Sequence, residues 1–487
     1  MKLSQLAREA APYFVGLNGD CEIGSLSQDS RLRTDIGLFF CIAGAKMDSH
    51  DFAGQAIEGG AVALVVTRML PGLDVPQLLV SNDRAAMALI AAAFYGHPAR
   101  SLRMIGITGT KGKTTTSYFA KAIMEHAGYL CGLIGTTGNM IGNRWMKSTL
   151  TTPDPIDLNR TLREMVDEGV QVVCMEVSAH AIDMQRLEGI QFEAAAYLNL
   201  SQDHLDYFGT MDRYFEAKKS FFMHGAVKNA ALNADEDTSS AIISDLCIPH
   251  SSFGICTNAD IFAKGIEISE NGVDFLLSLW NEHVYPVHLQ LMGMFNVYNA
   301  LAATALGLIM GVEPATICKA LESVRSVPGR AEVLDTHTLY KVILDYSHSP
   351  DAMKNILTTA REFTRNRIII VFGCGGDRDQ GKRPQMGEIA GRMADHSILT
   401  SDNPRNEDPM TILRMVEQGM KQTAGIYEVI ENRRDAIKAA LQLANEGDVV
   451  ILAGKGDETY QEIRGVKRSF DEKQIVRELL NQQDGEA

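Results

Sequence analysis

The sequence has few of the features that mark secreted, disulfide-stabilised or membrane-spanning proteins. Its eight cysteines form no Cys-x-x-Cys pair, and most of them stand in apolar segments such as residues 172–175. This placement favours buried free thiols in a reducing compartment over disulfides. No uninterrupted apolar run is long enough to span a membrane, and the first residues lack the apolar core of a signal peptide. We therefore expect a cytoplasmic protein without a membrane partner.

Positive charge is also scarce. The 46 lysines and arginines are outnumbered by 61 aspartates and glutamates, so the net charge is −15 at pH 7. Such an acidic chain is a poor match for nucleic acid, and we expect no nucleic-acid partner. A local basic cluster can still bind a small anionic substrate. The length of 487 residues exceeds what one core supports and suggests about three domains, which we expect in a monomer.

Residues 103–116 have the pattern of a phosphate-binding loop. An apolar strand leads into Thr108-Gly-Thr-Lys-Gly-Lys113, and a helix is expected from Thr114. Glycines let backbone N–H groups close on an anion, and the helix dipole favours negative charge. The final lysine can reach terminal phosphates, and a threonine hydroxyl can bind Mg²⁺. Ile107 stands where the usual motif has its first glycine, so a plain turn is the alternative, but we predict a nucleotide site.

The succession of strands and helices predicts an α/β protein of three domains. Residues 1–98 are predicted to form a small α/β domain, and residues 99–330 a largely parallel sheet with helices between its strands. Residues 331–487 begin a second alternating series, a Rossmann-like α/β domain. Ligands of parallel sheets bind at the carboxyl ends of the strands, so polar residues at those ends are the candidates for a site.

In the central domain, two strand ends carry candidate metal ligands. Glu176 follows the apolar segment 170–175, and His204 follows the segment 194–200. A carboxylate beside a phosphate loop suits Mg²⁺, which binds oxygen ligands and phosphates. His180, in the segment after Glu176, could polarise or ligate, but Glu176 or His180 alone is equally well explained as a satisfied polar group. Lys218 shares a helix face with Tyr214, which by itself describes an ordinary lysine with its stem on an apolar surface.

Polar residues elsewhere extend the predicted site. Asn296 and Asn299 lie on one helix face, and their amides can read a base or hold backbone. Asp29-Ser30-Arg31 can contact a phosphate or a sugar, with a helix N-cap as the simpler explanation. Four apolar strands of the third domain each end in glycine and charged residues, which indicates one shared site. The arginines expected to converge there on a carboxylate-bearing substrate are Arg378, Arg383 and Arg405.

Together these motifs resemble the Mur ligases, ATP-dependent enzymes that add amino acids to the peptidoglycan precursor. The resemblance runs in order through nearly the whole chain, over Asp29-Ser-Arg31, residues 109–115, Thr151-Thr-Pro-Asp154, residues 176–180, residues 199–206, Phe295-Asn-Val-Tyr-Asn299, Pro328-Gly-Arg330, Asp345-Tyr346, residues 372–384 and Gly454-Lys-Gly456. It implies that ATP phosphorylates the D-glutamate carboxylate of UDP-N-acetylmuramoyl-L-alanyl-D-glutamate. The amine of meso-2,6-diaminopimelate then displaces phosphate, which gives an amide, ADP and phosphate.

The resemblance also implies residue roles. The implied catalytic residues are Lys113, His204 and Lys218. The implied ATP contacts are Gly109, Thr110, Lys111, Gly112, Lys113, Thr114, Thr115, Asn296, Asn299, Arg330 and Asp345. The implied Mg²⁺ ligands are Thr114, Glu176, His204 and Lys218, the last carbamylated by CO₂ into an anion. The implied contacts to the UDP-sugar-peptide are Ser30, Ala45, Lys46, Met47, Thr151, Thr152, Ser178 and Arg186. The implied contacts to the amino acid are Arg378, Asp402, Asn403, Pro404, Arg405, Gly454 and Glu458.

Asp402-Asn-Pro-Arg405 resembles the signature of those members that add meso-2,6-diaminopimelate. This amino acid has a carboxylate at its far end that an arginine fork can hold, whereas the ammonium of lysine would be repelled. A lysine-adding ligase is the alternative, followed by a folate-type polyglutamate ligase and a nucleotide-binding protein without turnover. Two positions depart from the family pattern: Met184 replaces a glutamine, and Asp457 replaces a histidine.

Overall fold

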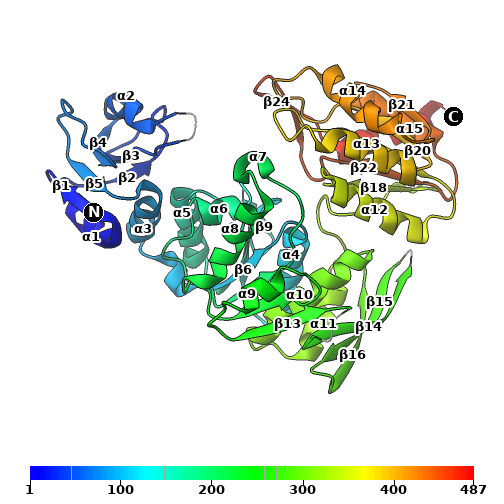
Figure 1. Cartoon of the computed structure of the whole chain (residues 1–487), viewed down its shortest axis with the longest axis horizontal. Coiled ribbons are helices and arrows are strands. Elements are labelled where there is room, and N and C mark those ends of the chain that lie inside the picture. Colours follow the sequence, from blue (N-terminus) through cyan, green and yellow to red (C-terminus); the bar gives the residue numbers. More distant parts are fainter. Residues whose placement is uncertain (45–46, 147, 149, 257–258, 270, 487) are drawn as a thin grey trace.

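The computed structural model describes residues 1–44, 47–146, 148, 150–256, 259–269 and 271–486. Three α/β domains follow one another along the chain, each around its own sheet (Figure 1). The predicted fold class is thereby confirmed. The sheets fall inside the ranges 1–98, 99–330 and 331–487, whose exact boundaries stay predictions. In the described part of the chain, no helix combines the length and the apolar character needed to cross a membrane.

The first domain has a five-stranded sheet in the order β1-β5-β4-β3-β2, in which only β1 is antiparallel to its neighbour. Its elements are α1 (Leu3–Glu9), η1 (Ala11–Tyr13), β1 (Phe14–Leu17), β2 (Ser25–Ser27), β3 (Gly37–Phe40), η2 (Ser49–Phe52), α2 (Ala53–Glu58), β4 (Ala61–Val66), β5 (Gln77–Val80), α3 (Asp83–Phe94) and η3 (Pro98–Ser101). The alanine-rich helix α3 packs with α1, and Leu6, Phe40 and Ile90 belong to the same buried core.

The central domain contains an eleven-stranded sheet in the order β16-β15-β14-β13-β12-β11-β6-β10-β7-β8-β9. Its elements are β6 (Arg103–Thr108), α4 (Lys113–His126), β7 (Cys131–Gly135), β8 (Gly138–Ile141), β9 (Arg144–Met146), α5 (Pro155–Asp167), β10 (Val172–Glu176), α6 (Ala179–Asp183), β11 (Ala194–Tyr197), α7 (Leu205–Phe208), α8 (Met211–Met223), β12 (Ala230–Asn233), α9 (Ser239–Ile243), β13 (His250–Gly254), β14 (Ile261–Ser269), β15 (Gly272–Leu279), β16 (His283–Leu289), α10 (Met294–Ile309) and α11 (Pro314–Ser323).

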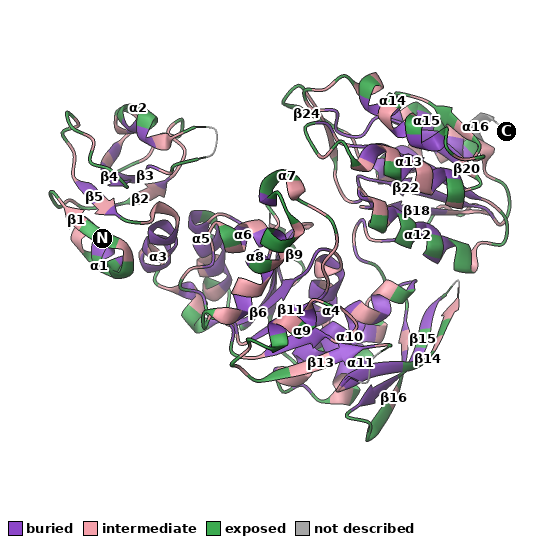
Figure 2. Cartoon of the chain, in the orientation of Figure 1, coloured by how far each residue is buried: buried purple, intermediate pink, exposed green. Residues whose placement is uncertain are grey.

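Strand β6 lies between β10 and β11 and runs parallel to both. Its side chains alternate between two cores: Ile105 and Ile107 face the core that includes α4 and α10, and Met104 faces the other. A strand covered on both faces must be apolar throughout, which explains the continuous hydrophobic run before the phosphate loop. Figure 2 shows the buried residues concentrated along these central strands. The strands β14, β15 and β16 extend the sheet as antiparallel neighbours.

The third domain has a six-stranded sheet in the order β17-β18-β22-β19-β20-β21, antiparallel only at β17, and a separate hairpin of β23 and β24. Its elements are β17 (Glu332–Leu334), β18 (Lys341–Asp345), α12 (Pro350–Phe363), β19 (Ile368–Phe372), α13 (Lys382–Met393), β20 (His396–Leu399), α14 (Pro409–Met420), β21 (Tyr427–Val429), α15 (Arg433–Leu443), β22 (Val449–Ala453), β23 (Tyr460–Ile463), β24 (Val466–Ser469) and α16 (Glu472–Glu486). The loops after β18, β19, β20 and β22 leave the carboxyl edge of the sheet, as their polar ends predicted.

Cysteine usage agrees with the expectation of free thiols. All eight cysteines are free, and five of them are buried: Cys41, Cys131, Cys174, Cys318 and Cys374. Burial raises the pKa of the Cys374 thiol to about 12, and that of Cys131 likewise to about 12. These thiols act as small apolar residues in the cores.

Candidate functional site

The phosphate loop joins β6 to α4, and the helix begins at Lys113, one residue before the expected start. Gly112 caps the helix with a positive φ of 86°, and a Cβ there would lie 2.3 Å from Asn299 Oδ1. Only glycine fits both the dihedral angle and this close approach. The ammonium of Lys113 folds back over the loop and donates to the carbonyl oxygens of Gly109 at 2.8 Å and Thr110 at 3.0 Å. Burial lowers the pKa of Lys113 to about 8.

Helix α10 lies directly against this loop. Asn299 donates through Nδ2 to Asn296 Oδ1 at 3.0 Å, and its own Oδ1 accepts from the hydroxyl of Thr116 at 3.3 Å. The predicted placement of the two asparagines on one helix face is confirmed. Arg330, from the segment between the second and third domains, donates to Thr114 Oγ1 at 3.1 Å. The loop is therefore held from one side by α10 and from the other by the connection to the third domain.

Glu176 ends β10 and has no exposed surface. Both of its carboxylate oxygens accept from Thr136: Oε1 from the backbone N–H at 2.9 Å and Oε2 from the hydroxyl at 3.0 Å. The hydroxyl of Thr136 is also 3.1 Å from that of Thr151. Sequence reasoning missed Thr136. Its position one residue after the apolar strand β7, next to β10, was the signal that could have found it.

His204 and Lys218 come together beside His180. The rings of His180 and His204 have centroids 4.7 Å apart, and the ammonium of Lys218 lies 4.5 Å from the ring centroid of Tyr214. The predicted shared face of Tyr214 and Lys218 is confirmed. Burial lowers the pKa of His204 to about 4 and that of Lys218 well below its ordinary value. Lys218 makes no hydrogen bond or ion pair with any residue that the structure describes.

These residues fit a magnesium ion that is held largely by phosphates. The described residues contain no group of three or more histidines, cysteines or acids that could enclose a metal. Mg²⁺ is usually bound through one or two protein groups plus phosphate oxygens and water, so Glu176 and His204 suffice. A buried lysine without a polar partner is costly as a cation, but a neutral amine can react with CO₂. The donor set therefore accommodates the metal and the modified lysine.

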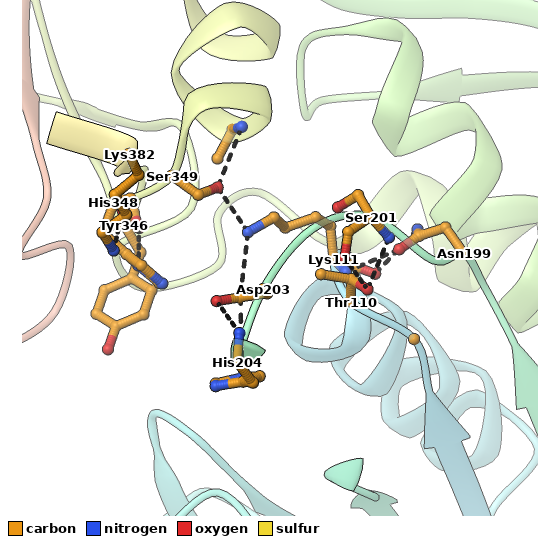
Figure 3. Close-up of polar contacts among 12 residues, drawn as sticks. Thr110, Lys111, Asn199, Ser201, Asp203, His204, Tyr346, His348, Ser349 and Lys382 are labelled. Carbon is orange, nitrogen blue, oxygen red and sulfur yellow. Dashed lines mark hydrogen bonds and ion pairs between the residues drawn. The ribbon is translucent and has the colours of Figure 1, made fainter. Parts of the chain in front are cut away.

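Lys111 leaves the loop and reaches the third domain (Figure 3). Its ammonium donates to Ser349 Oγ at 2.8 Å and lies 3.5 Å from Asp203 Oδ2. Ser349 caps α12, and the neighbouring His348 accepts through its carbonyl oxygen from Lys382 at 2.8 Å. Burial, together with the nearby ammonium groups of Lys111 and Lys382, lowers the pKa of His348 to about 3. Positive charge from two domains thus gathers around Asp203.

The predicted nucleotide contact Asp345 lies at the end of β18 and serves the connection between the domains. Its carboxylate accepts from the backbone N–H of Ala331 at 2.7 Å and from the hydroxyl of Ser347. Arg330 stacks on the ring of Tyr346 at 4.7 Å from guanidinium to centroid. Both groups fix the turn that carries Arg330 to Thr114.

The substrate residues predicted near the first domain fall into two places. Thr152 and Ser178 meet in the central domain, where the backbone N–H of Ser178 donates to Thr152 Oγ1 at 3.0 Å. Arg186 joins them by donating to the carbonyl oxygen of Thr152 at 2.8 Å. In the first domain, Ser30 donates to Gln55 at 3.1 Å and Met47 is exposed. The predicted contacts Ala45 and Lys46 lie outside the described residues.

Met184 stands where the family pattern has a glutamine, and the glutamine that follows it makes a contact between domains. The next residue, Gln185, accepts from Asn82 of the first domain at 2.6 Å, and the sulfur of Met184 lies 3.5 Å from Arg186 Nη2. The glutamine one position later therefore links the two domains.

The arginines of the third domain divide into two kinds. A Cβ on Gly375 would lie 2.9 Å from Arg405 Nη1 and 3.8 Å from Arg378 Cγ, so these two arginines flank the same glycine. Arg405 donates to the carbonyl oxygen of Gly376 at 2.7 Å. The expectation for Arg383 is wrong: it has no exposed surface and forks onto Glu407 at 2.7 and 2.8 Å. Its guanidinium is committed to the protein interior because α13 carries it under the loop.

The rest of the predicted amino-acid site surrounds the loop after β22. Asn403 donates to Glu458 Oε2 at 2.8 Å. Asp402 is buried, and its carboxylate accepts from the backbone N–H of Asn403 at 2.6 Å. The same carboxylate lies so close to Gly454 that a Cβ on this glycine would be 2.6 Å from Oδ2. Pro404 is buried next to Arg405. The predicted residues are brought together, with Glu458 and Arg405 at the accessible side.

Known proteins and protein families are similar to this chain over most of its length. Residues 107–307 match the Mur ligase middle domain, and residues 329–456 match the Mur ligase glutamate ligase domain. The chain is 44% identical to a UDP-N-acetylmuramoyl-L-alanyl-D-glutamate--2,6-diaminopimelate ligase of Geobacillus thermodenitrificans, over 99% of this chain and 100% of the relative. An enzyme of the same name from Clostridium botulinum is 40% identical over 99% of this chain and 100% of the relative. A solved structure with that name is 32% identical, covers 95% of both chains and superposes with a TM-score of 0.67. The chain belongs to the Mur ligase family.

Proposed function

We propose that this chain is an ATP-dependent amide ligase that adds meso-2,6-diaminopimelate to UDP-N-acetylmuramoyl-L-alanyl-D-glutamate in the cytoplasmic synthesis of the peptidoglycan precursor. One observation carries the proposal. The phosphate loop, Glu176 and the pair of His204 and Lys218 meet at one edge of the central sheet, and Lys111 reaches from there to the third domain. The substrates are proposed from the relatives named UDP-N-acetylmuramoyl-L-alanyl-D-glutamate--2,6-diaminopimelate ligase, which match 99% of the chain.

ATP is held by the loop and by its neighbours. The backbone N–H groups of residues 109–113 and the N-terminus of α4 favour the phosphates. Among the residues that the structure describes, the ammonium of Lys113 donates only to backbone carbonyls, so it is able to turn toward phosphate oxygens. Arg330 adds a second cation at Thr114. Asn299 holds α10 against the start of α4 through Thr116, Asn296 supports Asn299, and both amides are proposed nucleotide contacts.

We propose Mg²⁺ at this site, with Thr114, Glu176 and His204 as candidate protein ligands and carbamylated Lys218 as an anion able to bind a second Mg²⁺. When bound, Mg²⁺ neutralises charge on the phosphates. Thr136 fixes both oxygens of Glu176. Burial keeps Lys218 in the neutral form that attacks CO₂, with loss of one proton and formation of an N–C bond.

The reaction then needs two substitutions. An oxygen of the D-glutamate carboxylate attacks the γ-phosphorus of ATP, and ADP leaves. The amine of diaminopimelate attacks the acyl carbon, phosphate leaves with the electron pair of the C–O bond, and one N–H proton passes to the departing phosphate. Thr151, Thr152, Ser178 and Arg186 position the first substrate, and Arg378, Arg405, Asn403 and Glu458 position the second. The contribution of the chain is charge neutralisation and orientation.

A phosphate-release assay tests the proposal. With ATP, the UDP-dipeptide and diaminopimelate together, the wild type releases phosphate, and omission of any one substrate stops it. Lys113→Ala should abolish turnover and leave thermal unfolding unchanged. Lys319→Ala, which removes an exposed lysine from α11 of the same domain, is the matched control and should turn over normally. Turnover retained by Lys113→Ala would refute the role of the loop.

A further inference from the structure

Lys455 is a buried lysine that none of the steps above uses. It lies between Gly454 and Gly456 in the loop after β22 and has no exposed surface. Lysine is almost never fully buried unless it is paired. Its ammonium lies 3.2 Å from Asn403 Oδ1 and 3.3 Å from Glu458 Oε2. The cost of burying this charge is therefore offset by two residues of the proposed amino-acid site.

The three side chains close a ring. Asn403 Nδ2 donates to Glu458 Oε2 at 2.8 Å, and Asn403 Oδ1 also accepts from the backbone N–H of Glu462 at 3.0 Å. The amide of Asn403 thus has one possible orientation. Turning it over would place its NH₂ group against the ammonium of Lys455 and its oxygen against the carboxylate of Glu458. Lys455 enforces this orientation from beneath.

Glu458 is the member of the ring that reaches the surface. Its side chain is 20% exposed, whereas that of Lys455 is 0% exposed. Within the described part of the chain, Oε2 is occupied by Lys455 and Asn403, and Oε1 has a single long contact, 3.4 Å from the hydroxyl of Tyr346. Oε1 is therefore the oxygen that can accept a hydrogen bond from a substrate ammonium. Lys455 lies behind it and cannot touch the substrate.

We propose that Lys455 is a positioning residue of the amino-acid site, which acts by holding Asn403 and Glu458 in the orientation that binds the ammonium of the incoming diamino acid. This inference rests on the proposed function. Without the ammonium, Asn403 can turn over and the Glu458 carboxylate loses its buried counter-charge. Binding of the diamino acid should weaken, whereas the loop that binds ATP should be unaffected.

The test is the steady-state kinetics of Lys455→Met, which keeps the apolar stem and removes the charge. The KM for diaminopimelate should rise by about tenfold or more, with the KM values for ATP and the UDP-dipeptide within about twofold of the wild type. Lys467→Met is the matched control. Lys467 is exposed on β24 and lies over the same ring, Tyr460, that Lys455 approaches, but it has no contact with Asn403 or Glu458. This control should keep all three KM values.

A double variant separates positioning from a merely structural role. If Lys455 acts through Asn403, Lys455→Met in an Asn403→Ala background should raise the KM for diaminopimelate far less than it does alone. An unchanged KM for diaminopimelate in Lys455→Met would overturn the inference. An equal rise in the KM values for all three substrates would overturn it as well. If Lys455→Met does not fold, Lys455→Gln, which keeps a hydrogen-bond donor, replaces it. The KM for diaminopimelate should again rise while the KM values for ATP and the UDP-dipeptide stay nearly unchanged. A wild type that attaches no diamino acid would overturn the proposed function and this inference together.

Discussion

The ammonium nitrogen of Lys111 lies 2.8 Å from the hydroxyl oxygen of Ser349, which joins the phosphate loop of the central domain to the cap of α12 in the third domain. Asp203 lies 3.5 Å from the same ammonium and offsets its charge. The loop proposed to bind ATP is thereby in direct contact with the domain proposed to deliver the amine. We therefore expect closure of the third domain and occupation of the loop to be linked through this side chain.

Removal of this link should slow turnover. Lys111→Met keeps the stem and removes the ammonium, so the third domain loses its contact with the loop, and kcat should fall by about tenfold. The melting temperature should change little, because the cores of both domains are untouched. Phosphate-release kinetics beside thermal unfolding measure the two effects. Lys354→Met, an exposed lysine on α12, is the control, and an unchanged kcat in Lys111→Met would rule out the link.

The lowered pKa of His348 should make the stability of the fold depend on pH. Burial and the nearby lysines lower its pKa from 6.5 to about 3 in the folded chain. As pH falls below 6.5, the unfolded chain binds a proton that the folded chain does not, so stability is lost between pH 6.5 and about 3. By pH 5 this loss should reach about 1–2 kcal/mol.

His348→Asn should remove that loss and keep the donation to the carbonyl oxygen of Tyr346, which the Nδ1 of His348 makes at 2.8 Å. Urea unfolding at pH 7.5 and pH 5 measures the difference, with exposed His224→Asn as the control. If the wild type and His348→Asn lost equal stability between pH 7.5 and pH 5, His348 would not be the cause of the loss.

Arg383 should matter for stability and not for substrate binding. Removing a fully buried guanidinium leaves Glu407 without its forked partner, and Arg383→Met should destabilise the fold by about 2–4 kcal/mol. Arg392→Met removes an arginine that forms an exposed ion pair with Glu388 on the same helix, and it should cost less than about 0.5 kcal/mol. Chemical denaturation measures both. Equal stability of the two variants would show that the buried pair is not needed.

Arg405 should govern binding of the amino acid. Arg405→Lys keeps the charge and loses the fork, so the KM for diaminopimelate should rise by about a hundredfold. The KM for ATP should stay the same, since the side chain of Arg405 contacts Gly376 and Glu462 of its own domain. Arg468→Lys, exposed on β24, serves as the control. A normal KM for diaminopimelate in Arg405→Lys would remove Arg405 from the site.

The parts of this site that could be predicted from the sequence are those fixed by local pattern. An apolar run followed by Gly-Thr-Lys-Gly-Lys predicts β6, the loop and α4, because the glycine dihedral angles and the helix start are short-range properties. Glu176 was found because a charged residue directly after a buried strand must emerge at the carboxyl edge of the sheet.

What could not be predicted depends on packing between distant segments. In the sequence Arg383 looks like Arg378 and Arg405, and only its position on α13 above Glu407 removes it from the surface. Lys111 belongs to the loop by sequence but contacts a residue 238 positions away. The antiparallel strands β14–β16 also escaped prediction, since their alternating polar and apolar residues form an edge extension of the sheet, with no helix between them.

The central claim is tested most directly by mass spectrometry of the product. The wild type is incubated with ATP, Mg²⁺, UDP-N-acetylmuramoyl-L-alanyl-D-glutamate and equal concentrations of meso-2,6-diaminopimelate and L-lysine. The account predicts a UDP-tripeptide that carries diaminopimelate, with one ADP and one phosphate formed for each amide. A product that carries lysine, or ATP hydrolysis without any amide, would contradict it.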